Sequence, residues 1–339
     1  MAKKSVHLPL ELITEILLRF SHPDFGTSHF QLAASPPTNR LVFLDNFFDV
    51  PEILSIDFDA SLNHDSSYSS LSLDFYLWNP STGVKKHIPA SPITIASNDH
   101  LFIMHFYGFG YDPSTDDYLV VFGSYEYTYD PTHRSVDLAI FSLRANKWKQ
   151  IESGSHFPYR IIPKGVDGPK AGLLLNGVIH WLGYNYETTR YAIIAFDLKD
   201  MTMSEIALPD EFIFRVSNPS FIEFDLWVLG GLISTWNMDM NTIEIWVMQE
   251  YKVHSSWTRT FHFSSHPTQD FSPLCFTNCG DIVGTVRGGC GGLVKFNDKG
   301  KLLECHYYGN FYFQRSQMTV YTESLLSLPS GIGQALDDS

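Results

Sequence analysis

The chain has 339 residues, 44% of them apolar, and a formal net charge of −14. This length supplies one large domain or two small ones, with enough apolar material for a core. Basic residues form no cluster beyond Lys3–Lys4 and Lys85–His87, so the composition argues against a protein that binds nucleic acid through its phosphates. The acidity is spread along the chain and indicates an ordinary soluble surface.

Aromatic residues make up 15% of the chain, alongside 23 glycines and 18 prolines, which favours many short strands separated by turns. The four cysteines lie between Cys275 and Cys305 and are too few for a disulfide framework in a chain of this size. Glu11 and Glu15 interrupt the N-terminal apolar run, which argues against a signal peptide, and no apolar stretch reaches membrane-spanning length. We therefore expect an intracellular protein, in the cytoplasm, the nucleus or both, with no membrane partner.

The first predicted element is an amphipathic helix over His7–Phe20. Pro9 suits the first helical turn, and Glu11 and Glu15 lie near the positive end of the helix. Its apolar residues recur at helical spacing, at Leu12, Ile13, Ile16, Leu17 and Phe20. After Phe20 the chain passes directly into the turn-rich segment SHPDFGTSHF.

Units that share one strand pattern follow along the rest of the chain. The segments Ile140–Ile151 and Ala195–Ile206 superpose without a gap, so that Phe141 matches Phe196 and Trp148 matches Met203. The apolar anchors of five such units lie 63, 55, 50 and 50 residues apart, at Trp78, Phe141, Phe196, Trp246 and Phe296. An internal period of this size indicates a repeat architecture.

Each unit predicts a β-hairpin, because alternating residues share one face of a strand, a polar turn reverses the chain, and an apolar residue returns on the partner strand. Further strand-like runs precede the hairpins, and Asn176–Gly177 is a typical hairpin turn. Four short strands at a period near fifty residues are typical of a β-propeller blade. We predict an all-β fold, a propeller of about five to six blades preceded by the short helix. The alternative is a β-sandwich, which has no reason to repeat one anchor pattern at this spacing.

Several segments resemble, in order, the landmarks of a plant family in which an F-box precedes a kelch-like F-box-associated interaction domain. They cover most of the chain: Trp78–Gly83, Tyr107–Val121, Ile179–Tyr184, Ala195–Leu198 and Ile243–Tyr251. Val320–Pro329 resembles the final strand of that domain, which would close the ring against the first blade. The family's Gly-Ser-Cys-Arg-Gly-Leu strand is replaced by Asp57–Leu77, so we expect the first blade to be thin or irregular.

The N-terminal helix resembles the start of the F-box itself, which docks receptors onto the Skp-family adaptor of SCF ubiquitin ligases. The resemblance assigns adaptor binding to Leu8, Pro9, Leu12, Ile13, Ile16 and Leu17. The second and third helices of an F-box do not follow, so residues 1–30 are predicted to be a truncated F-box remnant and residues 31–335 the propeller domain. Because an isolated helix of this length is marginal in water, we expect adaptor docking to be weak or absent.

Candidate catalytic and metal-binding groups each have a simpler interpretation. Asp112, Asp116 and Asp117 lack the ordered ligand series of a calcium loop and favour a solvated turn. Cys275, Cys279, Cys290 and Cys305 lack the two-residue spacing of a zinc knuckle. The glycine-rich segment 288–292 lacks the Lys-Ser/Thr of a phosphate-binding loop. We predict no catalytic residue, no metal and no cofactor.

Target binding is predicted at exposed aromatic residues in loops between strands. The best candidates lie in the segments YGFGY, YEYTY and YNYE and are Tyr107, Tyr111, Tyr125, Tyr127, Tyr184 and Tyr186. The resemblance implies a substrate-recognition subunit of an SCF-type ubiquitin ligase that binds a target protein through the propeller. The alternatives are a stand-alone interaction scaffold, or a competitor of full-length relatives. A propeller enzyme would instead need carboxylates, or histidine with a metal, converging on the central channel.

Overall fold

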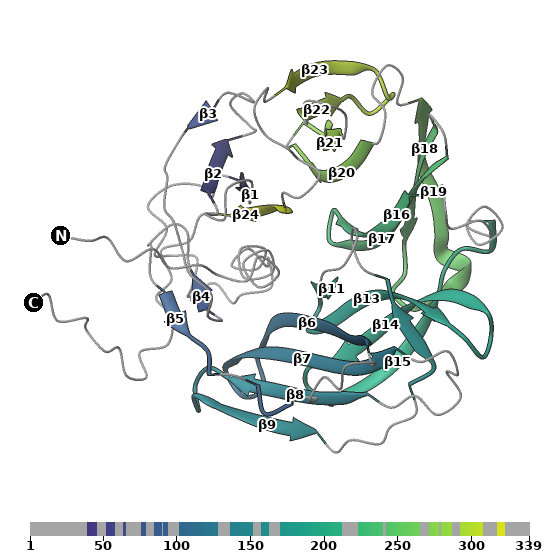
Figure 1. Cartoon of the computed structure of the whole chain (residues 1–339). Helices are drawn as coiled ribbons and strands as arrows, with labels where there is room; N and C mark the ends of the chain where they lie inside the picture. The colour runs from purple at the N-terminus through teal and green to yellow at the C-terminus, as the bar shows by residue number, and fades with distance from the viewer. Residues whose placement is uncertain are drawn as a thin grey trace, which may run out of the picture.

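A computed structural model describes residues 39–45, 52–57, 64–65, 76–78, 85–89, 91–93 and 102–322, with gaps at 128–135, 152–156, 163–169, 212–222, 240–241, 265–270, 278, 287–291 and 308–316. Strands form nearly all of the regular structure in these residues, and they assemble into six sheets arranged as a ring (Figure 1). We number the sheets I to VI in chain order. The predicted N-terminal helix over His7–Phe20 lies outside the described residues.

Sheets III and IV form the lower part of the ring in Figure 1. Sheet III contains four antiparallel strands, β6 (Phe102–Asp112), β7 (Asp117–Tyr127), β8 (Asp137–Ser142) and β9 (Lys147–Ile151). Sheet IV contains β12 (Leu173–Leu175), β13 (Val178–Asn185), β14 (Arg190–Asp197) and β15 (Thr202–Ala207). In both sheets the strands follow one another outward from the centre.

Two short strands lie on the inner edges of these sheets. β10 (Tyr159–Ile161) pairs with the end of β13, whereas β12 pairs with its start, so two separate pieces of chain occupy the first-strand position of sheet IV. Between them, β11 (Lys170–Ala171) pairs in parallel with β6 of sheet III. The chain therefore crosses from sheet IV to sheet III and back before β12 begins.

Sheets V and VI repeat the four-strand pattern. Sheet V contains β16 (Glu223–Leu229), β17 (Leu232–Asp239), β18 (Thr242–Met248) and β19 (Trp257–Ser264), with a short 3₁₀ turn, η3 (His254–Ser256), before β19. Sheet VI contains β20 (Phe271–Phe276), β21 (Ile282–Val286), β22 (Gly292–Phe296) and β23 (Leu302–Tyr307). The repeat predicted from the sequence is confirmed, because Phe141, Phe196, Trp246 and Phe296 all lie on the third strand of their sheets.

The ring closes by pairing the end of the chain with its beginning. β24 (Gln317–Thr322) lies antiparallel to β1 (Asn39–Asp45), and β2 (Glu52–Asp57) and β3 (His64–Asp65) complete sheet I. The predicted closure of the ring is therefore confirmed, although residues 323–329 of the predicted segment Val320–Pro329 lie outside the described residues. Sheet II has two described strands, β4 (Tyr76–Trp78) and β5 (Lys85–His87). Most of Asp57–Leu77 lies outside the described residues, so the expectation of a thin or irregular first blade stays a prediction. Six sheets match the predicted five to six blades.

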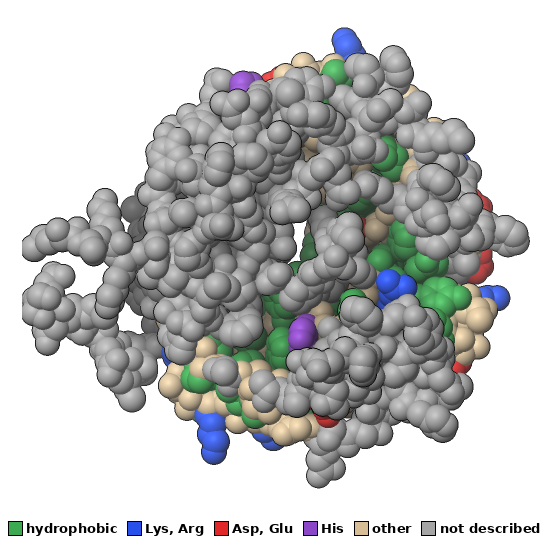
Figure 2. Space-filling model, viewed as in Figure 1, with side chains coloured by type: hydrophobic (Ala, Val, Ile, Leu, Met, Phe, Trp, Pro, Cys, Tyr) green, Lys and Arg blue, Asp and Glu red, His purple; other side chains and the backbone are tan. Residues whose placement is uncertain are grey.

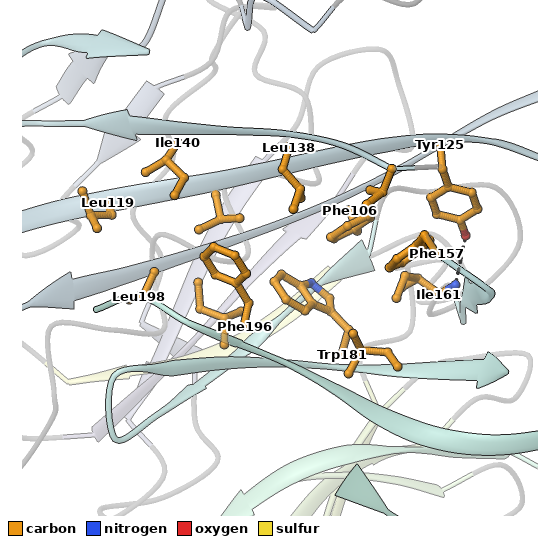
Figure 3. Packing of buried hydrophobic residues seen from close by; sticks show 14 residues of the cluster. Phe106, Leu119, Tyr125, Leu138, Ile140, Phe157, Ile161, Trp181, Phe196 and Leu198 are labelled. Carbon is orange, nitrogen blue, oxygen red and sulfur yellow. Dashed lines mark hydrogen bonds between the residues drawn. The ribbon is translucent and has the colours of Figure 1, made fainter. Parts of the chain in front are cut away.

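The core lies between successive sheets. Phe106 of sheet III points toward Trp181 of sheet IV, with ring centroids 5.1 Å apart in an edge-to-face arrangement (Figure 3). Phe157 stacks on the same Phe106 ring at 5.9 Å. Four separate clusters of buried apolar side chains fill the interfaces between sheets II and III, III and IV, IV and V, and V and VI. Sheets III, IV and V therefore bury apolar side chains on both of their faces. Such two-sided burial explains near-continuous apolar runs such as LVVFG in β7.

Indole groups also link neighbouring sheets through hydrogen bonds to main-chain carbonyls. Four such bonds, of 2.7–3.0 Å, join Trp148 Nε1 to Pro89 O, Trp181 to Tyr107, Trp227 to Leu274 and Trp257 to Ala207. These tryptophan side chains thus fill the space between sheets, and each indole N–H finds a hydrogen-bond acceptor there.

The two ends of the ring differ in their connections. At one end, which we call the hairpin rim, the turns 113–116, 143–146, 176–177, 198–201, 230–231, 249–256, 277–281 and 297–301 join paired strands within sheets III–VI. Asn146 and Met201, which are equivalent in the repeat, both have positive φ there, 49° and 54°. At the other end, the crossover rim, the chain passes from each sheet to the next, and the turn 186–189 joins β13 to β14.

Candidate functional site

Two of the six tyrosines predicted to bind a target are buried in strands. Tyr107 on β6 is 3% exposed and packs in the II–III core, and Tyr125 on β7 is 1% exposed. The Tyr125 hydroxyl accepts a hydrogen bond from the Ile161 main-chain N–H at 2.9 Å (Figure 3). The expectation that these two tyrosines are exposed in loops is wrong. Both faces of β6 and β7 are buried, so side chains that point to either face lie in the core.

Tyr111 and Tyr127 lie at opposite ends of sheet III. The Tyr111 hydroxyl donates a hydrogen bond of 2.7 Å to Asp116 Oδ1 in the hairpin-rim turn. This bond to Asp116, followed by partial burial, raises the pKa of Tyr111 to about 12. Tyr111 therefore holds a turn together. Tyr127 ends β7 opposite Phe102, at the crossover rim, and its side chain lies outside what the structure describes.

Tyr184 and Tyr186 come together at the crossover rim with two further aromatic residues. Tyr184 lies edge-to-face with Tyr186 at 5.2 Å and with its cross-strand partner Tyr191 at 5.0 Å. Tyr191 in turn lies edge-to-face with Phe224 of sheet V at 4.9 Å. All four side chains are partly exposed. We call Tyr184, Tyr186, Tyr191 and Phe224 the tyrosine cluster; it bridges sheets IV and V.

The turn that carries Tyr186 is fixed by the buried side chain of Asn185. The Asn185 Oδ1 atom accepts hydrogen bonds from the main-chain N–H groups of Glu187 and Thr188, at 2.9 and 3.2 Å. Its Nδ2 group donates to Glu205 Oε2 at 2.9 Å, and the Tyr186 N–H donates to Pro158 O. An aromatic surface held in this way loses little conformational entropy when it binds a partner.

Within the tyrosine cluster, Tyr191 has a pKa above its ordinary value. Burial raises the pKa of Tyr191, and the neighbouring Tyr184 raises it further, whereas Arg160 acts in the opposite direction. Beside the cluster, burial and a hydrogen bond to Glu205 raise the pKa of Tyr159. Neutral phenols can both donate and accept hydrogen bonds, which suits recognition of polar groups on a protein surface.

A row of polar side chains continues from the tyrosine cluster across sheet V. Phe224, Asn237 and Glu244 are neighbours on adjacent strands, and His262 follows on β19. The Glu244 side chain is 3% exposed; its Oε1 atom lies 3.0 Å from Arg259 Nη1 and 3.6 Å from His262 Nε2. Asn237 is 1% exposed, and within the described part of the chain neither its Nδ2 nor its Oδ1 has a hydrogen-bond partner.

Sequence reasoning missed Tyr191, Phe224, Asn237 and Glu244. Tyr191 and Phe224 come together with Tyr184 only when sheets IV and V pack side by side. Asn237 gave one signal, since it is a carboxamide flanked by Trp236 and Met238 in a strand-like run. Asparagine is depleted in strands, so its position between two apolar residues is unusual.

The acidic turn of sheet III is occupied by its own hydrogen bonds. Asp112 accepts from the Ser114 N–H at 2.9 Å and from the Thr115 hydroxyl at 2.7 Å. Asp117 accepts from the Arg144 N–H at 2.8 Å and from the Ser142 hydroxyl. The predicted turn is confirmed, but the expectation that its carboxylates are solvated is wrong for Asp112 and Asp117, which are 2% and 6% exposed, whereas Asp116 is exposed.

A serine, a histidine and an aspartate occupy one row of sheet III, but not in a catalytic arrangement. His105, Ser124 and Asp137 are cross-strand neighbours in that order. In a catalytic set the imidazole lies between the other two groups and bonds to both. Here Ser124 lies in the middle and is fully buried, and among the described residues its Oγ atom and His105 Nδ1 make no hydrogen bond. Burial also lowers the pKa of His105.

Cys279 and Cys305 are exposed thiols, Cys275 is partly buried, and Cys290 lies outside the described residues. Across the described ranges, no three His, Cys, Asp or Glu side chains gather closely enough to hold a metal ion. Within the same ranges, no helix has the length and apolar character needed to cross a membrane. The space-filling view shows a narrow opening near the centre of the ring, with hydrophobic side chains among the described residues beside it (Figure 2).

Comparison with curated proteins identifies relatives in Arabidopsis thaliana. The chain is 30% identical over 205 residues to F-box protein CPR1, covering 56% of this chain and 47% of that protein. It is 25% identical over 272 residues to F-box protein At4g22390, covering 70% and 65%. A third relative, F-box/kelch-repeat protein At3g23880, is 26% identical over 206 residues, covering 60% and 48%. The chain thus spans about half to two thirds of the length of these relatives.

Among solved structures, an exo-β-1,3-galactanase from Clostridium thermocellum is 11% identical to the chain, with a TM-score of 0.38 over 76% of this chain and 59% of that one. A likeness of this size carries no argument about activity. Residues 61–288 match the model of the F-box associated beta propeller domain, and this range covers more than half of the chain and most of the described ring. The chain therefore belongs to the plant F-box protein family that carries this β-propeller domain.

Proposed function

We propose that this chain is the target-recognition subunit of an SCF-type ubiquitin ligase, which acts inside the cell by holding a target protein on its propeller. The observation that carries the proposal is the family match over residues 61–288, supported by relatives that are themselves named F-box proteins. The polypeptide performs no chemistry in this function. Its contribution is to bring a bound protein close to the ligase.

The target-binding surface is assigned to the tyrosine cluster at the crossover rim. Tyr184 and Tyr186 are partly exposed, whereas Tyr107 and Tyr125 lie in the core. Tyrosine is enriched at protein interfaces because its large ring loses few degrees of freedom and its hydroxyl forms a hydrogen bond. The turn that carries Tyr186 is already fixed by Asn185, which favours binding without rearrangement of the backbone.

The connection to the ligase depends on the N-terminal segment. Leu8, Pro9, Leu12, Ile13, Ile16 and Leu17 match the first helix of an F-box, but the segment after Phe20 does not continue the pattern. We infer that the chain docks weakly on a Skp-family adaptor. If docking fails while target binding persists, the chain acts as a competitor of full-length relatives.

The test is an adaptor pull-down with the full chain, run beside a version in which a complete F-box replaces residues 1–30. The restored version is expected to retain the adaptor, and the natural chain to retain little of it. Failure of the restored version to bind would contradict the ligase function. Tight retention by the natural chain would contradict weak docking and leave the ligase function supported.

A further inference from the structure

Polar side chains of the hairpin-rim turns are paired within those turns, whereas a few buried polar atoms deeper in the sheets have no partner among the described residues. At the hairpin rim, Asp112, Asp117, Asp197 and Asn297 accept hydrogen bonds from their own or neighbouring turns. Among the described residues, the buried polar atoms without a partner include Ser124 Oγ, His105 Nδ1, Trp246 Nε1 and both polar atoms of Asn237. His105 and Ser124 lie in the crossover half of sheet III, Asn237 lies two residues from the crossover end of β17, and Trp246 lies two residues from the hairpin end of β18. Because buried polar groups are normally paired, a carboxamide that uses neither its donor nor its acceptor indicates a position where a partner can complete both hydrogen bonds.

Asn237 can be compared directly with Asn185. Both lie on the second strand of their sheet near the crossover rim, Asn185 opposite Tyr159 and Asn237 opposite Phe224. The Asn185 carboxamide donates to Glu205 and accepts two main-chain N–H groups. The Asn237 carboxamide has neither kind of partner among the described residues. It therefore presents one unused acceptor and an unused pair of donor hydrogens.

Asn237 faces the seam between sheets IV and V. It shares a sheet face with Leu226, Ile233 and Trp246, which pack against sheet IV. Its cross-strand neighbour Phe224 is also the last member of the tyrosine cluster. A partly exposed aromatic surface thus leads from the rim to an unpaired carboxamide.

We propose that this seam binds an extended peptide segment of a partner protein, with an aromatic or proline side chain on the tyrosine cluster and a main-chain peptide group on Asn237. A peptide group offers one donor and one acceptor, which matches the two free ends of the carboxamide. A phosphate-rich ligand fits less well, because the chain has a net charge of −14. Since Asn237 is 1% exposed, peptide binding at this position requires a neighbouring side chain to move, and its partly exposed cross-strand neighbour Phe224 is the candidate. This inference rests on the proposed function, in which the partner is the target.

The probe is a phage-displayed library of random dodecapeptides panned on the full chain. Selected peptides are synthesised, and their Kd values are measured by fluorescence anisotropy. The Tyr186→Ala and Asn237→Leu variants are each expected to weaken binding at least tenfold. The control variant, Lys299→Ala, alters an exposed residue of the hairpin rim and is expected to leave Kd within twofold.

Tyr186→Ala changes a partly exposed turn residue, so it keeps the test valid even if Asn237→Leu fails to fold. Hydrogen exchange supplies an independent readout: a bound peptide should protect amides of β13 and β16 and leave those of the β22–β23 turn unchanged. A library without binders, or peptides that bind both seam variants normally, would overturn the inference.

The outcome is separate from that of the adaptor experiment. If peptides bind elsewhere while the restored F-box version retains the adaptor, the assignment of the peptide-binding site to the seam is wrong and the ligase function stands. If peptides bind the seam but the restored version retains no adaptor, the interaction surface stands without the ligase.

Discussion

The indole Nε1 of Trp181 donates a hydrogen bond to the main-chain carbonyl of Tyr107, 2.9 Å away in the neighbouring sheet. The same carbonyl accepts the Gly172 N–H at 2.8 Å, beside the point where β11 pairs with β6. The Tyr107 carbonyl on β6 therefore accepts hydrogen bonds from two segments: from Trp181 on β13, and from Gly172, which lies between β11 and β12. Both bonds lie where the chain returns from sheet III to sheet IV.

Trp181→Phe should lower the free energy of unfolding by about 2–4 kcal/mol, because a fully buried indole is replaced by a smaller ring and one hydrogen bond is lost. The Tyr107 carbonyl keeps its bond to Gly172, so no acceptor is left unpaired by the change. Trp148→Phe is the matched control. Its indole also bonds a carbonyl of the adjacent sheet, but it is partly exposed, and we expect a loss of about 1 kcal/mol or less. Urea unfolding measures both; equal losses would show that burial does not set the difference.

Gly172→Ala should destabilise the fold by about 1–3 kcal/mol through overpacking. A Cβ atom at Gly172 would lie 2.4 Å from Ile179 Cγ2 and 2.5 Å from Trp181 Cε2, both fixed in the III–IV core. Gly177→Ala is the comparison, since no atom lies within 4 Å of its Cβ position and its φ of +75° alone opposes the change. We expect about 1 kcal/mol there. A larger loss at Gly177 than at Gly172, measured by thermal unfolding, would contradict the packing argument.

The repeat could be predicted from the sequence because its signals are local. Phe141 pairs across the hairpin with Trp148, and Phe196 with Met203, in each case seven residues further along the chain. A short sequence window therefore contains both strands and the turn. Asn176–Gly177 likewise forms the expected hairpin turn, with positive φ at both residues. Such features depend on turn chemistry and alternation over about ten residues, which the sequence contains.

The parts that the sequence did not predict depend on packing between sheets. Tyr107 and Tyr125 lie in strands buried on both faces, and in such strands alternation carries no information about exposure. β10, β11 and β12 are two or three residues long, and their pairing is set by the strands that they meet. Tyr191 and Phe224 are 33 positions apart and become neighbours only across the IV–V seam. A candidate site built from such contacts requires the assembled ring.

Acid should destabilise the fold partly through Asp112. Burial alone would raise the pKa of its carboxyl, but hydrogen bonds from Ser114 and Thr115 outweigh burial and lower that pKa below its ordinary value. A lowered pKa in the folded state means that the stabilisation is present above the unfolded pKa, about 3.9, and is lost as pH falls through the folded value. Asp112→Asn should therefore reduce the dependence of unfolding free energy on pH below about 4. Urea titrations between pH 2.5 and 6 would show this; an unchanged slope in the variant would exclude Asp112 as the cause.

Glu244 and Arg259 should show strong coupling in a double-mutant cycle. The Glu244 carboxylate is 3% exposed, so Arg259→Met leaves a buried negative charge with His262 at 3.6 Å. We expect a loss of about 1–3 kcal/mol, less than for a fully buried pair because Arg259 itself is 40% exposed. Adding Glu244→Leu should recover part of that loss, since no charge then remains buried. Additive losses in urea unfolding would mean that the two side chains do not interact in the folded state.

Asn237 and Asn185 should respond in opposite ways to the same substitution. Asn185→Leu removes three hydrogen bonds and leaves the N–H groups of Glu187 and Thr188 without their acceptor, so we expect a loss of about 2–4 kcal/mol. Asn237→Leu removes a carboxamide that makes no hydrogen bond among the described residues and adds an apolar side chain to an apolar seam. Its stability should stay level or rise by about 1 kcal/mol, because the cost of keeping an unpaired polar group buried disappears. A loss at Asn237 as large as that at Asn185, measured by urea unfolding, would indicate that an internal water molecule satisfies the carboxamide. In that case Asn237 would be a structural residue of the fold, and only Tyr186 and its neighbours would remain as the surface available to a partner.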